Sequence, residues 1–147
     1  MIYRKRVVDS ELRERLGSSG AVLIEGPKAC GKTETALQVA NSSVMLDVDV
    51  QAQLALDIEP SLVLEGATPR LLDEWQKYPI IWNEVRRTVD LRKAPGQFIL
   101  TGSSVPNDDT NRHSGAGRFS ILKMRPMTIF ETGHSAGTIS LRELMVA

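Results

Sequence analysis

Residues 25–36, EGPKACGKTETA, contain two glycines with four residues between them, followed directly by a lysine and a threonine. This pattern, G-x4-G-K-T from Gly26 to Thr33, lies between the apolar run AVLI and a segment rich in helix-forming residues. A strand before and a helix after are the context in which such spacing forms a phosphate-binding loop. The loop binds phosphate through backbone N–H groups and the N-terminus of the helix that follows. The pattern therefore predicts a site for a nucleoside triphosphate, and a chance match is the less favoured alternative.

Individual positions of the loop have expected roles. Gly26 and Gly31 permit backbone conformations and close approaches that a side chain would prevent. Lys32 is expected to contact the β- and γ-phosphates and to act in catalysis, and the Thr33 hydroxyl is expected to bind Mg²⁺. The residues expected to bind the nucleotide, taken as ATP, are Gly26, Pro27, Lys28, Ala29, Cys30, Gly31, Lys32, Thr33 and Glu34.

A second segment, RLLDEW, places Asp73 and Glu74 directly after an apolar run. Ligands of α/β proteins bind at the carboxyl ends of the strands. Asp73 is therefore the candidate to hold Mg²⁺, directly or through water, and Glu74 is the candidate to orient or deprotonate the attacking water. The alternative is a pair of solvated acids near the start of a helix, where acids are also favoured.

A third segment, QFILTGSS at 97–104, passes from a buried strand into a polar turn. Thr101 is the catalytic candidate here, through contact with the γ-phosphate or the attacking water, and Ser103 is second. The alternative is an ordinary hydroxyl at a strand-to-turn boundary, because serine and threonine are common in turns.

Arginine side chains, from the same or a neighbouring subunit, often meet the charge that develops during phosphoryl transfer. Arg118, which follows the residues HSGAG, is the first candidate for this catalytic role. Arg112, Arg86 and Arg87 are alternatives. A surface salt bridge is the other explanation for Arg118, and the subunit in which it would act is left open.

The elements that must position these residues alternate along the chain. Strands are expected over 21–25, 43–49, 70–74, 97–104 and 118–124. Helices are expected over 9–16, 32–41, 51–60 and 79–90, with Asp9 or Ser10 as the N-cap of the first, and short helical pieces are expected within 127–147. Strands that alternate with helices predict an α/β layer fold with a mostly parallel five-stranded sheet.

Composition narrows the class of protein. The chain has 147 residues, the length of one domain. Its 18 basic and 18 acidic side chains cancel, which argues against an overall basic field for nucleic acid. Cys30, the single cysteine, excludes an internal disulfide and fits a reducing compartment. No apolar run reaches the roughly 20 residues that span a bilayer, so we expect a cytoplasmic location and no membrane partner.

With these residues identified, the chain resembles a large prokaryotic family of AAA-type ATPases, in which an N-terminal ATPase domain precedes a C-terminal domain of unknown function. The resemblance extends from YRKRVVD to SLREL, nearly the whole chain. The segments that carry it are IEGPKACGKTETA, PRLLDEWQ, QFILTGSS, HSGAGR and MRPMTIFETG. It implies a three-layer P-loop NTPase fold of the additional-strand, catalytic-glutamate class, with the sheet order 5-1-4-3-2.

The resemblance also implies roles and boundaries. It makes Lys32 and Thr33 the nucleotide and metal residues, Asp73 and Glu74 the second motif, and LTGSS the sensor region. Family members continue into a winged-helix-like segment and a domain similar to restriction-endonuclease folds. Because the chain ends at Ala147, residues 1–147 are expected to be the AAA-type ATP-binding domain without the helical lid and the effector domain.

Together these features predict a Mg²⁺-dependent ATPase domain in which water attacks the γ-phosphate of ATP to drive or switch an attached effector domain. The main alternative is a module that binds ATP without efficient hydrolysis. A small-molecule kinase is less favoured, because the Asp-Glu pair suits water activation. A GTPase is less favoured still, because no Asn-Lys-x-Asp motif occurs in the chain. A homo-oligomer is left open, and so is contact with DNA or protein through the domain that family members carry after this one.

Overall fold

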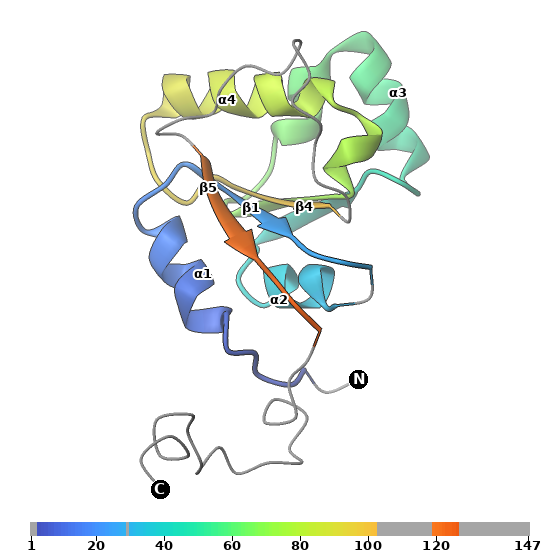
Figure 1. The fold of residues 1–147 in the computed structure, drawn as a ribbon. Helices are drawn as coiled ribbons and strands as arrows, with labels where there is room; N and C mark the ends of the chain where they lie inside the picture. Colours follow the sequence, from blue (N-terminus) through green and yellow to red (C-terminus); the bar gives the residue numbers. More distant parts are fainter. Residues whose placement is uncertain (1–2, 29, 103–118, 127–147) are drawn as a thin grey trace, which may run out of the picture.

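The computed structural model describes residues 3–28, 30–102 and 119–126, which form a sheet between two layers of helices (Figure 1). The strands are β1 Ala21–Glu25, β2 Ser42–Met45, β3 Arg70–Asp73, β4 Phe98–Gly102 and β5 Phe119–Lys123. The α-helices are α1 Asp9–Leu16, α2 Lys32–Leu37, α3 Val50–Ile58 and α4 Ile80–Arg92, and the 3₁₀-helices are η1 Pro60–Leu64 and η2 Trp75–Lys77. Within these described residues, no helix is both long and apolar enough to cross a membrane.

The strands form one sheet in the order β2-β3-β4-β1-β5, and every neighbouring pair is parallel. Read from the opposite edge, this is the predicted order 5-1-4-3-2, so the predicted α/β fold is confirmed. Because all strands run in one direction, their carboxyl ends lie along the same edge of the sheet. There the register pairs Thr101 of β4 with Asp73 of β3 on one side and with Ile24 of β1 on the other.

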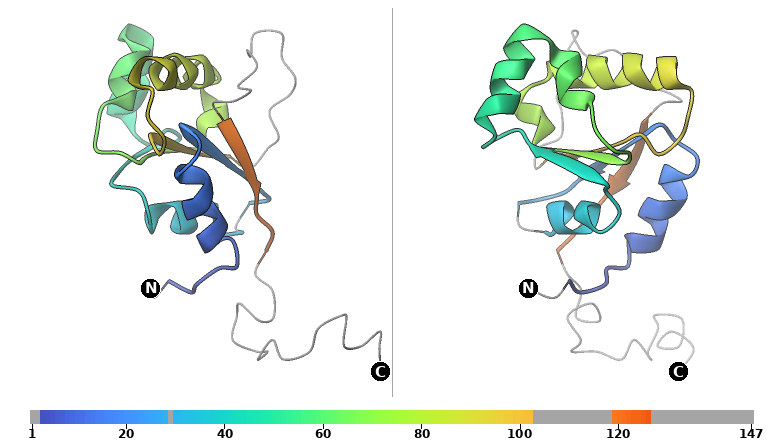
Figure 2. Two further views of the ribbon diagram at one scale, coloured as in Figure 1. Left: turned by 90° about the vertical axis from the view of Figure 1, so that its left-hand side faces the viewer. Right: turned by 180° about the vertical axis from the view of Figure 1, so that it is seen from behind.

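Alternate side chains of β1 divide the apolar core between the two helical layers. Ala21 and Leu23 belong to the cluster that also contains buried residues of α3 and α4, whereas Val22 and Ile24 pack with residues of α1 and α2. Figure 2 shows α1 and α2 on one side of the sheet and α3 and α4 on the other. Since successive strand side chains point to opposite faces, a strand covered on both sides must be apolar throughout, which explains the run AVLI.

Both tryptophans are core residues, in agreement with the interpretation that they pack between helix and sheet. Trp75 and Trp82 are 2% and 5% exposed, and their ring centroids lie 5.3 Å apart. The Trp82 ring also stacks on Phe119 of β5, with centroids 3.8 Å apart and planes 7° from parallel. Aromatic pairs of this kind contribute about 0.5–1.5 kcal/mol beyond their buried area. They join η2 and α4 to the edge strand β5.

The first helix begins without the predicted cap. Its N-cap is Val8, so neither Asp9 nor Ser10 holds that position. The Asp9 carboxylate instead accepts a hydrogen bond from the Arg6 backbone N–H, at 2.9 Å. The prediction was wrong because this acid is engaged with the segment before the helix.

Two further elements are shorter than predicted. The helix expected over 32–41 ends at Leu37, because the next amides bond to carbonyls three residues back, the tighter pattern that ends many helices. The strand expected over 43–49 is only Ser42–Met45. Asp49 caps α3 instead, since its carboxylate accepts a hydrogen bond from a backbone N–H in the first turn, at 3.1 Å.

Candidate functional site

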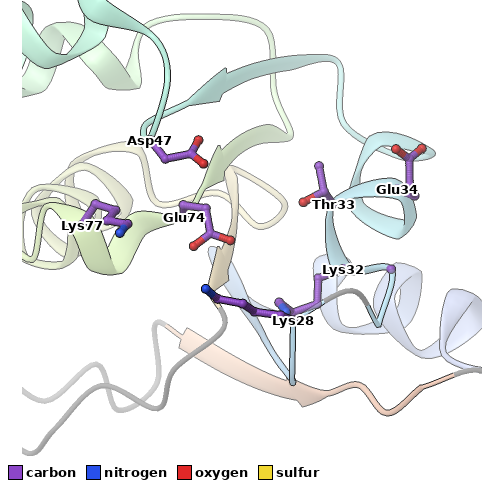
Figure 3. A pocket seen from close by; sticks show the side chains of 8 residues that line it. Lys28, Lys32, Thr33, Glu34, Asp47, Glu74 and Lys77 are labelled. Atoms are coloured by element: carbon purple, nitrogen blue, oxygen red, sulfur yellow. The ribbon is translucent and has the colours of Figure 1, made fainter.

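A cavity of about 380 Å³ lies where the loop after β1 meets the residues that follow β2 and β3 (Figure 3). Its walls are formed by Lys28, Gly31, Lys32, Thr33, Glu34, Asp47, Glu74 and Lys77. Five residues of the predicted nucleotide-binding loop therefore border the same cavity as the acid predicted to activate water.

The two glycines of the loop occupy places that a side chain would strain. Gly31 is the N-cap of α2 and has a φ of 94°, in the left-handed region that favours glycine. A Cβ on Gly26 would lie 2.6 Å from the carbonyl oxygen of Met124. The loop thus runs directly against the segment that follows β5.

Lys32 is held inside the loop. Its side chain is buried, at 6% exposed, and its Nζ donates hydrogen bonds to the carbonyl oxygens of Gly26, at 2.9 Å, and Pro27, at 2.8 Å. A buried ammonium group requires partners of this kind. Phosphate oxygens are acceptors of the same type, so a bound phosphate can replace one or both carbonyls.

The other loop residues differ in burial and in the groups that they contribute to the site. Cys30 is 3% exposed and packs in the apolar cluster beneath α1 and α2, and its Sγ lies 3.9 Å from the Nζ of Lys32, inside the loop. Gly26 and Pro27 contribute the carbonyls that bind Lys32. Lys28 is exposed, and Figure 3 shows its side chain extending toward the Glu74 side of the cavity. Ala29 lies outside the described residues.

A carboxylate joins the loop to the centre of the sheet. Oδ1 of Asp73, the last residue of β3, accepts hydrogen bonds from Thr33 Oγ1, at 2.6 Å, and from Thr101 Oγ1, at 2.5 Å. Asp73 is 7% exposed and Thr101 is fully buried. The three candidates named from separate motifs therefore meet at one oxygen atom.

This cluster fits a magnesium ion by its chemistry. Mg²⁺ prefers oxygen ligands, and nucleotide-binding sites hold it with one or two protein oxygens plus substrate phosphates and water. The Thr33 hydroxyl borders the cavity, and the Asp73 carboxylate lies within hydrogen-bonding distance of it. Among the residues that the structure describes, no group of three or more histidine, cysteine or acidic side chains forms an all-protein metal cage.

Glu74 does not continue the strand, as the prediction for 70–74 supposed. It has φ 58° and ψ 46°, a left-handed conformation that is uncommon for a non-glycine residue, and it is the N-cap of η2. This turn brings the Glu74 side chain to the cavity wall. There the carboxylate accepts a hydrogen bond from the side-chain amide of Gln76.

Two cavity residues were not found from the sequence. Asp47 follows β2 and Lys77 ends η2, and Figure 3 shows them on the Glu74 side of the cavity. Asp47 lies just past the observed end of β2, but it was missed because the strand was expected to continue to residue 49. Lys77 carried no such signal, because it depends on the turn that starts at Glu74.

The arginine candidates do not meet at the cavity in the described part of the chain. Arg86 and Arg87 are on α4, away from the cavity walls, and Arg87 forms an exposed ion pair with Glu84 at 3.4 Å. Ser103, Arg112 and Arg118 lie outside the described residues, so the roles predicted for them stay predictions.

Comparison with known proteins agrees with the fold. Residues 18–133 match the model of a family described as an AAA domain, a range that includes the phosphate loop and the Asp73–Glu74 pair. Two uncharacterized proteins, one from Mycobacterium bovis and one from Mycobacterium tuberculosis, are each 28% identical over 140 residues, which is 92% of this chain. The chain spans about a third of their length, 32% in each case. The chain belongs to the AAA domain family, a group of nucleotide-binding, ATPase-like proteins with the P-loop fold.

Proposed function

We propose that this domain binds ATP with Mg²⁺ and hydrolyses it to ADP and phosphate, and that hydrolysis drives or switches an attached domain. The observation that supports this most directly is the link between the loop and the acid pair. Thr33 donates to Asp73, while Glu74 borders the same cavity as Lys32. A phosphate loop alone serves many activities, but a neighbouring acid able to act on water favours hydrolysis.

The binding step rests on the loop and on the charge of the cavity walls. Backbone amides at the start of α2 and the ammonium of Lys32 would bind the β- and γ-phosphates. Lys28 and Lys77 add two further ammonium groups to the walls. The walls also carry three acids, Glu34, Asp47 and Glu74. Charge-assisted hydrogen bonds from ammonium groups to phosphate oxygens are about twice as strong as neutral ones.

The metal would be held by the Thr33 hydroxyl and by the Asp73 carboxylate, directly or through water. When bound, Mg²⁺ supplies positive charge that neutralises the β- and γ-phosphate oxygens. Thr101 is fully buried and donates to Asp73, so we now assign it to positioning that carboxylate instead of contacting the γ-phosphate. Both threonine hydroxyls bond to Oδ1, so among the described residues Oδ2 is the oxygen that could approach the metal.

Glu74 would act on the attacking water. A new bond forms between the water oxygen and the γ-phosphorus, and the bond from this phosphorus to the β–γ bridging oxygen breaks. Glu74 accepts a proton from the water, and the products are ADP and inorganic phosphate. Arg118 remains a candidate to stabilise the charge that develops.

A second candidate function is ATP binding without efficient hydrolysis. The hydrogen bond from Gln76 to the Glu74 carboxylate favours it, because a carboxylate engaged in this way is less available to a water molecule. In that case the bound nucleotide itself would be the signal to an attached domain.

Phosphate release from ATP and Mg²⁺ tests the proposal, with Lys32→Ala, Glu74→Gln and the exposed Glu14→Gln of α1 as matched control. We expect Lys32→Ala to lose ATP binding. Glu74→Gln should bind ATP as wild type does but release phosphate at least about 100-fold more slowly, the range for removal of a general base. Glu14→Gln should match wild type.

Three results would change the assignment. Equal turnover in wild type, Lys32→Ala and Glu74→Gln would contradict the proposed roles. Tight ATP retention by wild type, with no release above background, would support the binding-only function. Transfer of labelled γ-phosphate to a small acceptor, instead of to water, would indicate a kinase.

A further inference from the structure

The segment before α1 contacts the phosphate loop through the buried side chain of Arg6. Arg6 is 5% exposed although it carries a charge. Its Nη1 donates to the carbonyl oxygen of Cys30, at 2.5 Å, and its Nη2 donates to that of Arg125, at 2.7 Å. One guanidinium group therefore ties the loop to the chain that leaves β5, and Figure 1 shows these segments at the same end of the molecule.

The bond to Cys30 has a consequence for the amide on the other side of the peptide. In a planar trans peptide, the C=O and the N–H point in opposite directions. Because the Cys30 carbonyl points at Arg6, the N–H of Gly31 points away from it, and Gly31 borders the cavity. A Cβ on Gly31 would lie 2.6 Å from Arg6 Nη1, so the guanidinium packs directly against the loop.

Arg6 is itself fixed by the residues around it. Its backbone N–H donates to Asp9 Oδ2 at 2.9 Å, and the Tyr3 hydroxyl donates to Asp9 Oδ1 at 2.6 Å. The same hydroxyl lies 3.1 Å from Oγ1 of Thr35, a buried residue of α2. Residues 3–9 thus contact both the phosphate loop and the helix that follows it.

We infer that Arg6 is a positioning residue of the phosphate site: it orients the Cys30–Gly31 peptide so that the Gly31 N–H faces the triphosphate. The inference rests on the proposed function for its ligand. Arginine suits this role because its planar fork donates in two fixed directions, to two carbonyls that belong to distant segments. Lysine carries the same charge but has no such fork.

The test compares Arg6→Lys and Arg6→Gln with Lys5→Gln, which removes one charge from the adjacent, exposed position. Binding of ATP and of inorganic tripolyphosphate is measured by calorimetry. We expect Arg6→Lys to weaken both about 10-fold and to the same extent, because the loss of loop geometry affects phosphates and not the base. Lys5→Gln should remain within about two-fold of wild type, as expected for an exposed charge.

Hydrogen exchange in the ligand-free proteins gives a second measurement. In Arg6→Lys, amides of residues 30–33 should exchange faster, while those of α4 stay unchanged. Unchanged exchange at 30–33 with wild-type affinity for tripolyphosphate would overturn the inference. A uniform increase that includes α4 would also overturn it, because it would indicate support of the whole fold instead of the loop.

The two proposals can fail separately. If wild type bound neither ATP nor tripolyphosphate, the proposed function would fail, while the exchange of residues 30–33 would still show whether Arg6 holds the loop. If Arg6→Gln does not fold, Arg6→Lys against wild type carries the comparison alone.

Discussion

The phosphate loop and the turn after β3 face each other across the cavity, and they are stabilised in different ways. On the loop side, Lys32 donates hydrogen bonds to two carbonyl oxygens, and Arg6 donates one to the carbonyl oxygen of Cys30. On the acid side, Glu74 adopts a left-handed conformation, which costs about 1–3 kcal/mol for a non-glycine residue. Its carboxylate bonds to Gln76 in the same short turn.

We infer from this difference that, under the proposed function, binding and turnover depend on different parts of the site. The loop is held by several hydrogen bonds, and a bound phosphate would replace the carbonyl partners of Lys32 without unfolding the loop. On the acid side, the hydrogen bond that the described residues give the Glu74 carboxylate comes from Gln76, so we expect this carboxylate to change position at low cost. We expect variants on the loop side to change affinity, and variants on the acid side to change rate.

The largest effect is expected where the two sides meet. Asp73→Asn keeps an acceptor for Thr33 and Thr101 but removes the charge that we propose attracts the metal. We expect the Mg²⁺ concentration for half-maximal ATP binding or turnover to rise about 100-fold, the upper range for loss of a metal-site partner. Magnesium titrations measure it. Asp47→Asn, an exposed acid of the same cavity, should change it less than about three-fold, and equal effects of the two would show that no special metal site exists at Asp73.

A substitution that strains the backbone of the loop should destabilise the loop side alone. Gly31→Ala places a Cβ against Arg6 at a φ of 94°, and we expect it to lower the free energy of unfolding by about 1–3 kcal/mol. Urea unfolding measures this value. Gly17→Ala is the control, because Gly17 has a φ of −74° that alanine adopts readily. Similar losses in both would mean that the conformation of Gly31 is not strained by a side chain.

A smaller effect, on the rate of phosphate release, is expected on the acid side. Gln76→Ala removes the amide that binds the Glu74 carboxylate, so we expect basal phosphate release to rise about three-fold while ATP affinity is unchanged. Gln38→Ala, an exposed glutamine of the loop side, should leave both unchanged. A fall in phosphate release with Gln76→Ala would show that this amide holds Glu74 in its working position instead.

The smallest effect concerns the segment behind the loop. Burial, followed by the hydrogen bond to Asp9, raises the pKa of Tyr3 to about 12, above its ordinary value of 10. The folded state therefore holds this proton more tightly, and the resulting stability is full below pH 10 and is lost as the pH rises through 12. The contribution is small because Tyr3 is only partly buried, so that solvent screens its interactions.

Phenolate absorbance measures this titration in Tyr78→Phe, where Tyr3 is the single tyrosine left of two. We expect a midpoint near 12 in the folded protein and near 10 in urea. A folded-state midpoint near 10 would mean that Tyr3 does not bond to Asp9 in solution, and the anchoring of residues 3–9 would have to be revised.

Local patterns were enough to predict the parts of the fold that local forces determine. The apolar run AVLI predicts a strand that is covered on both faces. Gly31 and Lys32 predict the turn and the start of the helix that follows. The sheet order came from a family resemblance, because strand pairing joins residues that are distant in sequence. Asp9 was misassigned since its partner Arg6 lies outside the helix pattern.

The site was predictable as a set of residues and less so as a geometry. Nothing in RLLDEW distinguishes a strand that continues through Glu74 from one that turns there, since the turn is fixed by Trp75 in the core. The same turn places Lys77 at the cavity. Arg6 gave no signal because its two acceptors are carbonyls, which every residue carries.

The two hydrogen bonds of Arg6, to Cys30 and to Arg125, also affect how the protein folds during its synthesis. Arg125 follows Arg6 by 119 residues, and closing so long a loop is slow and entropically costly. A chain emerging from the ribosome would display the complete glycine–lysine signature long before the carbonyl of Arg125 is synthesised. We therefore expect ATP to be a late ligand of the nascent polypeptide, bound only once β5 has joined the sheet.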